Sequence, residues 1–281
     1  MIDYSDESAR NHRLDTLLAS VPLIVNHAIR KHMQWENDRF GPRRLAGIVT
    51  MFSGGDDSTV LAHIMRERTD YFGHANTGIG IEATREFVRK TCAEWGVPLI
   101  ERSPLPHRSY EAYVRSQGFP GPGRHDFVFN RIKGSPFEQI AATLVQNPYR
   151  ERVLFVAGRR FFESSRRISR KIPLSERKYS TVWVSPLRGW TTADLQTYRR
   201  RFPDVPHNQV AADIGMSGEC LCGAFAHPGE LDQLRSYAPA ADAVAEIDRL
   251  AELASAAGLS RKLCTWGRAS VYEACRNACN R

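Results

Sequence analysis

The stretch Arg44–Ser58, RLAGIVTMFSGGDDS, determines how the rest of the chain is interpreted. Its first residues form a short apolar run that suits a buried strand, and two glycines interrupt this run. Behind the glycines, apolar residues recur at helical spacing, at Val60, Leu61, Ile64 and Met65. The order of strand, glycine-rich turn and helix predicts one βα unit of a parallel sheet.

The alternation of strands and helices continues on the carboxyl side of this unit. Strands are predicted at 71–76, 97–100, 153–157 and 182–184, and helices at 81–95, 137–145 and 192–201. Residues 102–136 contain five prolines and are expected to form an irregular surface loop, which leaves a lid open as its role. Helical stretches are also predicted near 228–237 and 240–257.

These elements predict an α/β fold with an open, mostly parallel sheet of five to six strands and helices on both faces. Three domains are expected: an N-terminal helical arm at 1–43, a nucleotide-binding α/β domain at 44–206, and a helical cysteine-rich region at 207–281. Pro22 leaves open whether the arm is one helix or two. The arm also leaves a homodimer open.

The turn between the first strand and its helix has the chemistry of a phosphate site. Two glycines let backbone N–H groups turn toward an anion, and the N-terminus of the following helix favours negative charge. Asp57 beside phosphates is explained if Mg²⁺ bridges its carboxylate to a pyrophosphate. The predicted phosphate-binding residues are Ser53, Gly54, Gly55, Asp57 and Ser58. The alternative is an ordinary turn, in which glycine, serine and aspartate are common.

A basic segment follows the strand at 153–157. Residues 159–171 read RRFFESSRRISRK, and they begin at the sheet edge where ligands of open α/β sheets bind. Arg160, Arg166 and Arg167 are therefore expected to face a phosphate or sulfate group. A solvated basic loop and a nucleic-acid contact are the alternatives.

Composition limits the class of protein. The 281 residues are 42% hydrophobic and 25% charged, with a net charge of +8, which excludes disordered, collagen-like and coiled-coil chains. The excess charge is mostly arginine, and it fits either a polyanionic partner or a solvated surface. The start MIDYSDESAR lacks the features of a signal peptide, and no stretch is apolar enough to span a membrane. A cytoplasmic protein without a membrane partner is expected.

Five of the six cysteines lie in the last quarter of the chain, at Cys220, Cys222, Cys264, Cys275 and Cys279. In a reducing compartment such a group is more typical of metal ligation than of disulfides. Thiolates held in pairs suit zinc or an iron–sulfur cluster, and cysteines scattered in a core are the alternative. Cys92 lies alone in a predicted helix and is expected to be a small buried side chain.

Four ordered segments resemble the PAPS (phosphoadenosine phosphosulfate) reductase-like family of the PP-loop ATP pyrophosphatase superfamily. They are SGGDDS at 53–58; Asn76, Thr77 and Gly78 with Glu82, Thr84, Arg85, Glu86 and Phe87; Gly158, Arg160, Glu163, Ser164 and Arg167; and Trp183, Ser185, Pro186, Leu187 and Trp190. The resemblance covers about 44–225. It implies the adenine nucleotide α-hydrolase-like fold.

The resemblance also implies site residues. Thr77 and Gly78 would abut the base or ribose of an adenine nucleotide (APS, PAPS or ATP), and Gly158, Arg160 and Arg167 its phosphates. Iron–sulfur members of the family imply a 4Fe-4S cluster on Cys220, Cys222, Cys264 and either Cys275 or Cys279. Asp57, Arg160 and Cys279 are the expected catalytic residues. Cys279 stands in for the family's C-terminal ECGxH thiol, which this chain lacks together with the Cys-Cys pair.

Three functions are consistent with these motifs and with the family resemblance. The first is sulfonucleotide reduction or sulfur transfer, with an electron or sulfur donor protein as partner. The second is ATP-dependent adenylation and thiolation of a nucleic acid, tRNA or DNA, in which Asp57 would hold Mg²⁺. The third is a non-enzymatic, cluster-bearing sensor of nucleotides or nucleic acids. Asp57 argues against the sensor, because a pure binder needs no metal-binding carboxylate.

Overall fold

The computed structural model describes residues 6–35, 41–161 and 172–267. Within them, a six-stranded sheet has the strand order β3-β2-β1-β4-β6-β5. The strands are β1 (Arg44–Met51), β2 (Tyr71–Ala75), β3 (Leu99–Arg102), β4 (Glu151–Val156), β5 (Ser175–Lys178) and β6 (Thr181–Val184). β1 pairs in parallel with β2 and β4, β4 pairs in parallel with β6, and β5 is antiparallel to β6. The predicted fold class, an open and mostly parallel sheet with helices around it, is confirmed.

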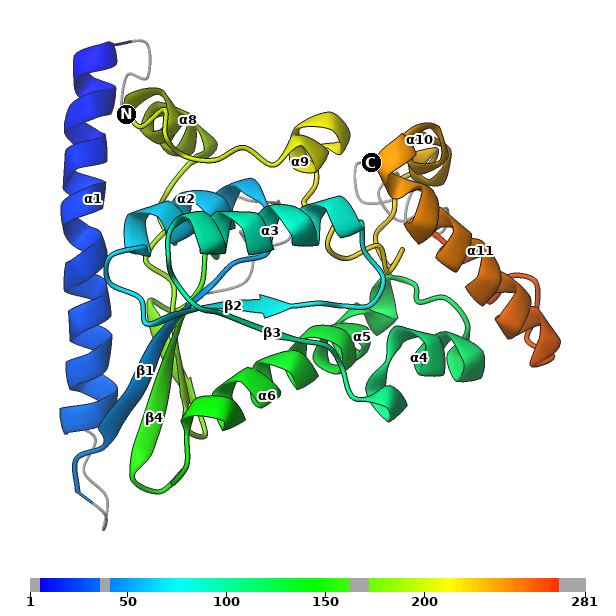
Figure 1. Ribbon diagram of the computed structural model, residues 1–281, viewed down its shortest axis with the longest axis horizontal. Coiled ribbons are helices and arrows are strands. Elements are labelled where there is room, and N and C mark those ends of the chain that lie inside the picture. The colour runs from blue at the N-terminus through cyan, green and yellow to red at the C-terminus, as the bar shows by residue number, and fades with distance from the viewer. Residues whose placement is uncertain (1–5, 36–40, 162–171, 268–281) are drawn as a thin grey trace, which may run out of the picture. The chain divides into compact units, whose positions relative to one another are not determined.

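The α-helices alternate with the strands as far as α8 (Figure 1). They are α1 (Glu7–Ile29), α2 (Asp56–Met65), α3 (Glu82–Glu94), α4 (Tyr110–Gln117), α5 (His125–Phe129), α6 (Ser135–Leu144), α8 (Thr192–Arg201), α9 (Gln209–Ile214), α10 (Glu230–Ser236) and α11 (Ala241–Ala256). Shorter helical turns are η1 (Arg30–Trp35), η2 (Pro106–Arg108), η3 (Pro122–Arg124), η4 (Asn130–Gly134) and η6 (Ala238–Ala240). In the part of the chain that the structure describes, no helix combines the length and apolarity that a membrane span requires.

The chain divides into two compact units. The first unit comprises residues 1–73, 89–100 and 140–207, and the second comprises 74–88, 101–139 and 208–281. Each unit has its own hydrophobic core. The three-domain division expected from the sequence stays a prediction.

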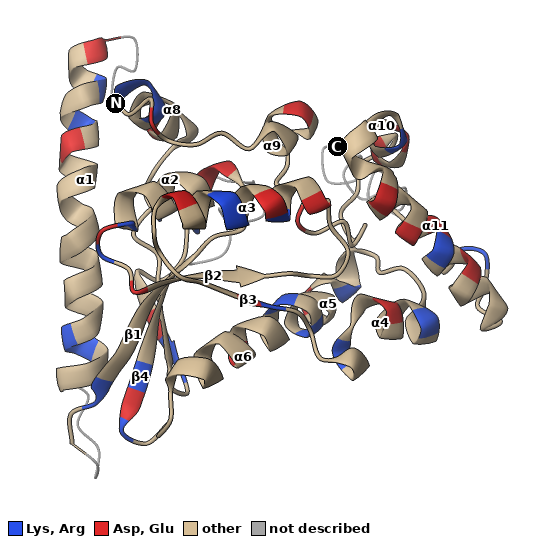
Figure 2. Ribbon diagram, viewed as in Figure 1, with Lys and Arg blue, Asp and Glu red and all other residues tan. Residues whose placement is uncertain are grey.

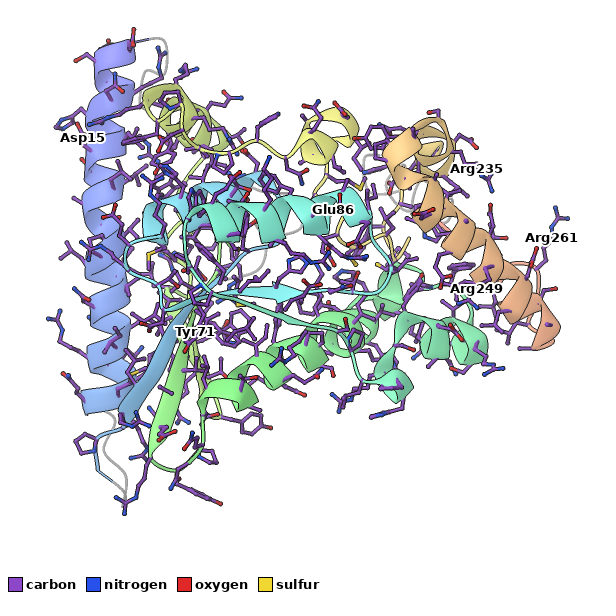
Figure 3. The ribbon with its side chains drawn as sticks, viewed as in Figure 1. Asp15, Tyr71, Glu86, Arg235, Arg249 and Arg261 are labelled. Atoms are coloured by element: carbon purple, nitrogen blue, oxygen red, sulfur yellow. The ribbon has the colours of Figure 1, made fainter. Side chains whose placement is uncertain are left out.

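The core of the first unit lies between β4, β6 and the helices α1, α2 and α8. Its fully buried side chains include Leu14, Val21, Leu61, Leu154, Val182 and Leu195. Pro22 lies inside α1 without ending it, so the arm is one helix up to Ile29. Arg13 of α1 bonds Asp194 of α8 at 2.8 Å, and Arg201 of α8 donates to Asp15 of α1, which Figure 3 labels. α1 is therefore joined to α8 by packing and by ion pairs.

The core of the second unit joins α4 to α11 and to the segments after β2 and α9. It buries Ile79, Ile81, Tyr110, Val114, Leu221, Ile247 and Trp266. Arg249 of α11, labelled in Figure 3, donates to Glu111 of α4 at 2.6 Å. The stretch 102–136, expected to be irregular, contains the ordered elements η2, α4, η3, α5 and η4 and the start of α6. The Ser109 hydroxyl caps α4 by accepting a hydrogen bond from the Ala112 N–H. This serine is a local signal for the start of a helix, but the many prolines of the stretch favoured the prediction of a loop.

Basic side chains are spread over many elements instead of being confined to one. Figure 2 shows Lys and Arg on α1, α3, α4, α8, α10 and α11, with acidic residues beside them on most of these helices. Several of these charges form surface ion pairs, such as Arg235 with Asp248 at 2.9 Å. Such exposed pairs contribute little to stability. The positive charge of the described residues is therefore spread over many elements and is not concentrated at one site.

His63 of α2 links the core of the first unit to its surface. Its Nδ1 lies 2.6 Å from the Tyr198 hydroxyl, and its Nε2 lies 3.0 Å from Oδ2 of Asp204. Burial lowers the pKa of His63 below its ordinary value, although Asp204 opposes the shift and Arg66 adds to it. The folded protein therefore holds His63 neutral in a range where the unfolded chain protonates it.

The protein is expected to lose stability on acidification from about pH 7.5 to about pH 5.5 in part through His63. The unfolded state binds the proton first as pH falls, so acid favours unfolding. Thermal melting at several pH values measures this, and His63→Gln is expected to flatten the dependence. His12→Gln, at an exposed position of α1, is the control. An unchanged slope in His63→Gln contradicts the prediction.

Candidate functional site

Residues 53–58, which we call the PP-loop, connect β1 to the first turn of α2 in the first unit. Gly54 has φ +76°, a backbone conformation that residues with a Cβ rarely adopt, so glycine is required there. The hydroxyl of Ser58 accepts from the Ser53 N–H at 3.2 Å and donates to the carbonyl of Gly55 at 2.9 Å. These bonds fold the loop back onto the first turn of α2. The N–H groups of that turn form the kind of site that binds phosphate.

Two adjacent carboxylates at the start of α2 each pair with an arginine. Oδ1 of Asp57 lies 2.8 Å from Nη2 of Arg160, and Oδ1 of Asp56 lies 2.6 Å from Nε of Arg199. The Arg160 side chain is 5% exposed, and its Nη1 also donates to the carbonyl of Trp190. The arginines offset the two negative charges, so the helix N-terminus keeps its attraction for an anion. Asp57 and Arg160, both predicted from the sequence, are brought together.

Gly158 allows the end of β4 to approach α2 closely. A Cβ at Gly158 would lie 3.1 Å from the Asp57 carbonyl oxygen and 3.3 Å from the Ser58 nitrogen. The backbone of Gly158 therefore packs against the backbone of the PP-loop. This packing holds Arg160 beside Asp57. Arg159 is engaged elsewhere, with Glu176 at 2.6 Å and the Ser185 hydroxyl at 2.9 Å. Glu163, Ser164, Arg166 and Arg167 lie outside the described residues.

Thr77 and Gly78 follow β2 and lie in the second unit. Gly78 has φ +73°, which again favours glycine. Thr77 is fully buried; its N–H donates to Oε1 of Glu219 at 2.9 Å and its hydroxyl to the Glu219 carbonyl at 2.6 Å. The described contacts of Thr77 are therefore with the chain itself. Its predicted role at the base or ribose stays a prediction.

Glu219 is the centre of a buried charged group. Its Oε2 lies 3.2 Å from Nε2 of His74 and 3.5 Å from Nε of Arg85, and all three side chains are at least nine-tenths buried. Gly80 lies against the same residue, because a Cβ there would fall 2.5 Å from the Glu219 carbonyl oxygen. Glu219 thus fixes the loop that carries the cysteines to the segment that carries Thr77. Sequence reasoning missed Glu219, since no motif or spacing marks it.

Cys220 and Cys222 form a hydrogen-bonded pair of thiols directly after Glu219. The hydrogen bond from Cys222 lowers the pKa of Cys220, against burial and with help from the charge of Lys133. The same bond, followed by burial, raises the pKa of Cys222. One thiolate is thus stabilised in this pair, which is the protonation state that metal ligation and nucleophilic attack require.

Cys264 lies in a segment that packs on the Cys220–Cys222 loop. The indole Nε1 of Trp266 donates to the Leu221 carbonyl at 2.8 Å. Gly223 has φ +70°, and a Cβ there would lie 2.7 Å from that Nε1, so the C-x-C-G glycine makes room for the ring. Cys264 itself donates to the Leu259 carbonyl at 3.5 Å. Cys275 and Cys279 lie outside the described residues.

The fit of these cysteines to a cluster is partial. Cys220 and Cys222 would supply two neighbouring sulfur ligands, and Cys264 follows in a segment packed on their loop. Among residues 6–35, 41–161 and 172–267, no group of three or more His, Cys, Asp or Glu side chains is placed to hold a metal ion. Cys92 is buried as expected, and burial raises its pKa to about 12.

A family model described as the phosphoadenosine phosphosulfate reductase domain matches residues 47–210. The chain belongs to the phosphoadenosine phosphosulfate reductase family. The predicted family and the predicted class of enzyme are therefore confirmed. The match contains the PP-loop, Thr77, Gly78 and Arg160 but ends before Cys220. The matched region of the reductase family therefore contains residues predicted to bind the nucleotide, and their role stays a prediction.

Solved structures resemble this member of the reductase family weakly. The PAPS reductase of Candida auris, a phosphate complex, has 18% identity and a TM-score of 0.47, over 75% of this chain and 92% of its own. The U34-tRNA thiolase NcsA of Methanococcus maripaludis, with its 4Fe-4S cluster, has 12% identity and a TM-score of 0.38, over 82% and 80%. No curated protein matches the sequence significantly.

Proposed function

We propose that this chain is a sulfur-transfer enzyme that binds an adenine nucleotide at the PP-loop and Arg160. The contact between Asp57 and Arg160 at the first turn of α2 carries the proposal. This contact supports the proposal because a carboxylate that could hold a metal and a planar donor of hydrogen bonds lie beside N–H groups suited to phosphate. Family membership supports an adenine nucleotide as the anion.

The nucleotide end of the site acts by binding and orientation. The PP-loop N–H groups and the hydroxyls of Ser53 and Ser58 would hold phosphate oxygens, and Arg160 would offset charge on the departing group. When ATP is bound, Asp57 would hold Mg²⁺, which neutralises phosphate charge. Thr77, Gly78, Gly158, Arg166 and Arg167 belong to the same proposal as further nucleotide-binding residues.

Two reactions are open to this site. In sulfonucleotide reduction, a thiolate attacks the sulfur of APS or PAPS, the S–O bond breaks and the nucleotide leaves; a second thiol then releases sulfite and leaves a disulfide. In thiolation, an acceptor oxygen attacks the α-phosphorus of ATP and pyrophosphate leaves; a sulfur nucleophile then displaces AMP. The first reaction needs a dithiol reductant, and the second needs a sulfur donor.

The cysteines are proposed to hold a 4Fe-4S cluster. Cys220, Cys222 and Cys264 would supply three ligands, and Cys275 or Cys279 the fourth, with the other thiol, Cys279 in the catalytic assignment, left to react. With four cysteine ligands such a cluster would supply a charge that tunes the site; with Cys220, Cys222 and Cys264 alone it would leave one iron open for sulfide. The stabilised thiolate in the Cys220–Cys222 pair supports this ligand set.

Anaerobic purification followed by iron and sulfide analysis tests the cluster, and two assays separate the reactions. Sulfite release from PAPS indicates reduction, and pyrophosphate release from ATP indicates adenylation. Cys220→Ser and Cys222→Ser are each expected to lose most of the iron, because each removes a ligand. Cys92→Ala, which alters a cysteine outside the proposed set, is expected to keep its iron. A protein containing only zinc contradicts the cluster, and turnover of neither nucleotide contradicts the enzyme.

A further inference from the structure

Two phenylalanines on α5 stand out because they are exposed. Phe127 is 49% exposed and Phe129 is 40% exposed, although the next residue, Val128, is buried in the core of the second unit. A five-residue helix with its valine inward and two aromatic rings outward presents apolar surface to solvent. Exposed aromatic side chains in such a group indicate a binding surface more often than chance exposure.

Further rings lie beside Phe129 and His125, whereas Phe127 lies beside Tyr113, at 6.0 Å, and Arg131. The ring of His125 lies 4.7 Å from Phe225 and 6.1 Å from Phe129, and Phe129 lies 6.4 Å from Phe137. The rings are tilted to one another by 36° to 62°, so they do not stack face to face on themselves. We call His125, Phe127, Phe129, Phe137 and Phe225, together with Arg131 and Lys133, the aromatic–basic strip.

The charge of the strip is positive. Arg131 lies 5.7 Å from the centroid of the Phe127 ring and is held there by donating to the His107 carbonyl. Lys133 follows within η4, a π-helical turn, and such turns are frequent at functional sites. The neighbouring acidic residue Glu138 pairs with Arg108 at 3.2 Å, and Asp126 lies 3.3 Å from Nδ1 of His125. Arg131 is thus a cationic group beside the exposed Phe127 ring, and Lys133 follows Arg131 by two residues.

Phe225 connects the strip to the loop that carries the thiol pair. Phe225 follows Cys222 by three residues, and Phe225 and Cys220 both pack against the core of the second unit. All of these residues belong to the second unit.

We propose that the aromatic–basic strip binds single-stranded nucleic acid. Aromatic faces stack on any unstacked base, and nearby Arg and Lys attract the phosphate backbone. Duplex DNA or RNA fits less well, since its bases are already stacked on one another. A nucleic acid bound by the strip would be the molecule that accepts the sulfur, an inference that rests on the proposed function. Binding of the nucleic acid does not rest on that function.

Fluorescence anisotropy with a labelled single-stranded oligonucleotide, as RNA and as DNA, tests the proposal without any adenine nucleotide present. We expect binding that weakens as salt rises and exceeds binding of the matching duplex. Phe127→Ala with Phe129→Ala is expected to weaken binding roughly tenfold or more, because stacking is lost. Phe127→Tyr with Phe129→Tyr is expected to retain it. Tyr149→Ala removes an exposed ring of the first unit, 64% exposed, and is expected to change nothing.

Several results would overturn the proposal. They are no binding by the wild-type protein, equal loss in Tyr149→Ala, or unchanged affinity in the double alanine variant. A protein that forms dimers through the strip, seen as a halved mass in the double alanine variant by analytical ultracentrifugation, would also overturn it. Nucleotide turnover is not measured here, so failure of oligonucleotide binding leaves the proposed nucleotide chemistry intact, and the reverse also holds.

Discussion

Asp57→Asn is expected to abolish the magnesium-dependent part of nucleotide binding and to lower turnover by about a hundredfold or more. Asparagine keeps the size of the side chain but removes the charge that would hold Mg²⁺ and that pairs with Arg160. Calorimetric titration with ATP, with and without Mg²⁺, measures the effect directly. Without Mg²⁺ the variant is expected to bind ATP at least as well as the wild type, because a negative charge near the phosphates has gone.

The adjacent Asp56 provides the control for this change. It lies on the same turn of α2 and pairs with Arg199, but its side chain is 51% exposed. Asp56→Asn is expected to change turnover by no more than about threefold, as for an exposed ion pair. Equal effects of the two substitutions, or full turnover in Asp57→Asn, would remove Asp57 from the site. Unchanged nucleotide affinity in Arg160→Ala would remove Arg160 in the same way.

Glu219→Ala is expected to destabilise the second unit by about 3 kcal/mol, because it removes the buried carboxylate beside Arg85 and leaves that guanidinium with the half-exposed Glu82 as its acidic partner. For a chain of this size that corresponds to a fall in Tm of roughly 10 °C. The substitution also removes the acceptor of the Thr77 N–H and so loosens the loop that carries Cys220 and Cys222. Faster alkylation of these thiols by iodoacetamide is expected beside the lower Tm.

Glu82 is the matched control for Glu219. It contacts the same guanidinium, Arg85, at 2.9 Å, but its side chain is 48% exposed. Glu82→Gln is expected to lower the free energy of unfolding by less than about 1 kcal/mol. Glu219→Gln, which keeps the shape and an oxygen for Thr77, is expected to lie between the two. Glu219→Ala with wild-type melting and alkylation would show that the buried group does not hold this loop.

The βα unit at residues 44–65 could be predicted because each of its features is local. The apolar run of β1, the glycines of the PP-loop and the helical spacing in α2 lie within one short window. β5, Ser175–Lys178, could not be predicted, because its residues are mostly exposed and polar and its position depends on pairing with β6. α4 was hidden in a proline-rich stretch for a similar reason: its partner α11 lies far along the chain.

The candidate site likewise contains residues that the sequence could predict and one residue that it could not. Asp57, Gly54 and Ser58 belong to one motif, and Arg160 follows a strand that was itself predictable, so their meeting could be expected from the sheet edge. Glu219 could not, because its partners are His74, Thr77 and Arg85, which precede it by more than a hundred residues. A lone glutamate carries no periodicity or spacing that would announce a buried charged group.

The division of the second unit into separate stretches of chain has a consequence for synthesis on the ribosome. Residues 1–207 contain every segment of the first unit, whereas the core that 74–88 and 101–139 share is completed by residues of 208–267. Because domains tend to fold as their segments emerge, the first unit can close while the second still awaits α11 and Trp266. Cys220, Cys222 and Cys264 therefore come together last. Iron and sulfide, if they bind there as proposed, would reach these cysteines after the PP-loop has formed.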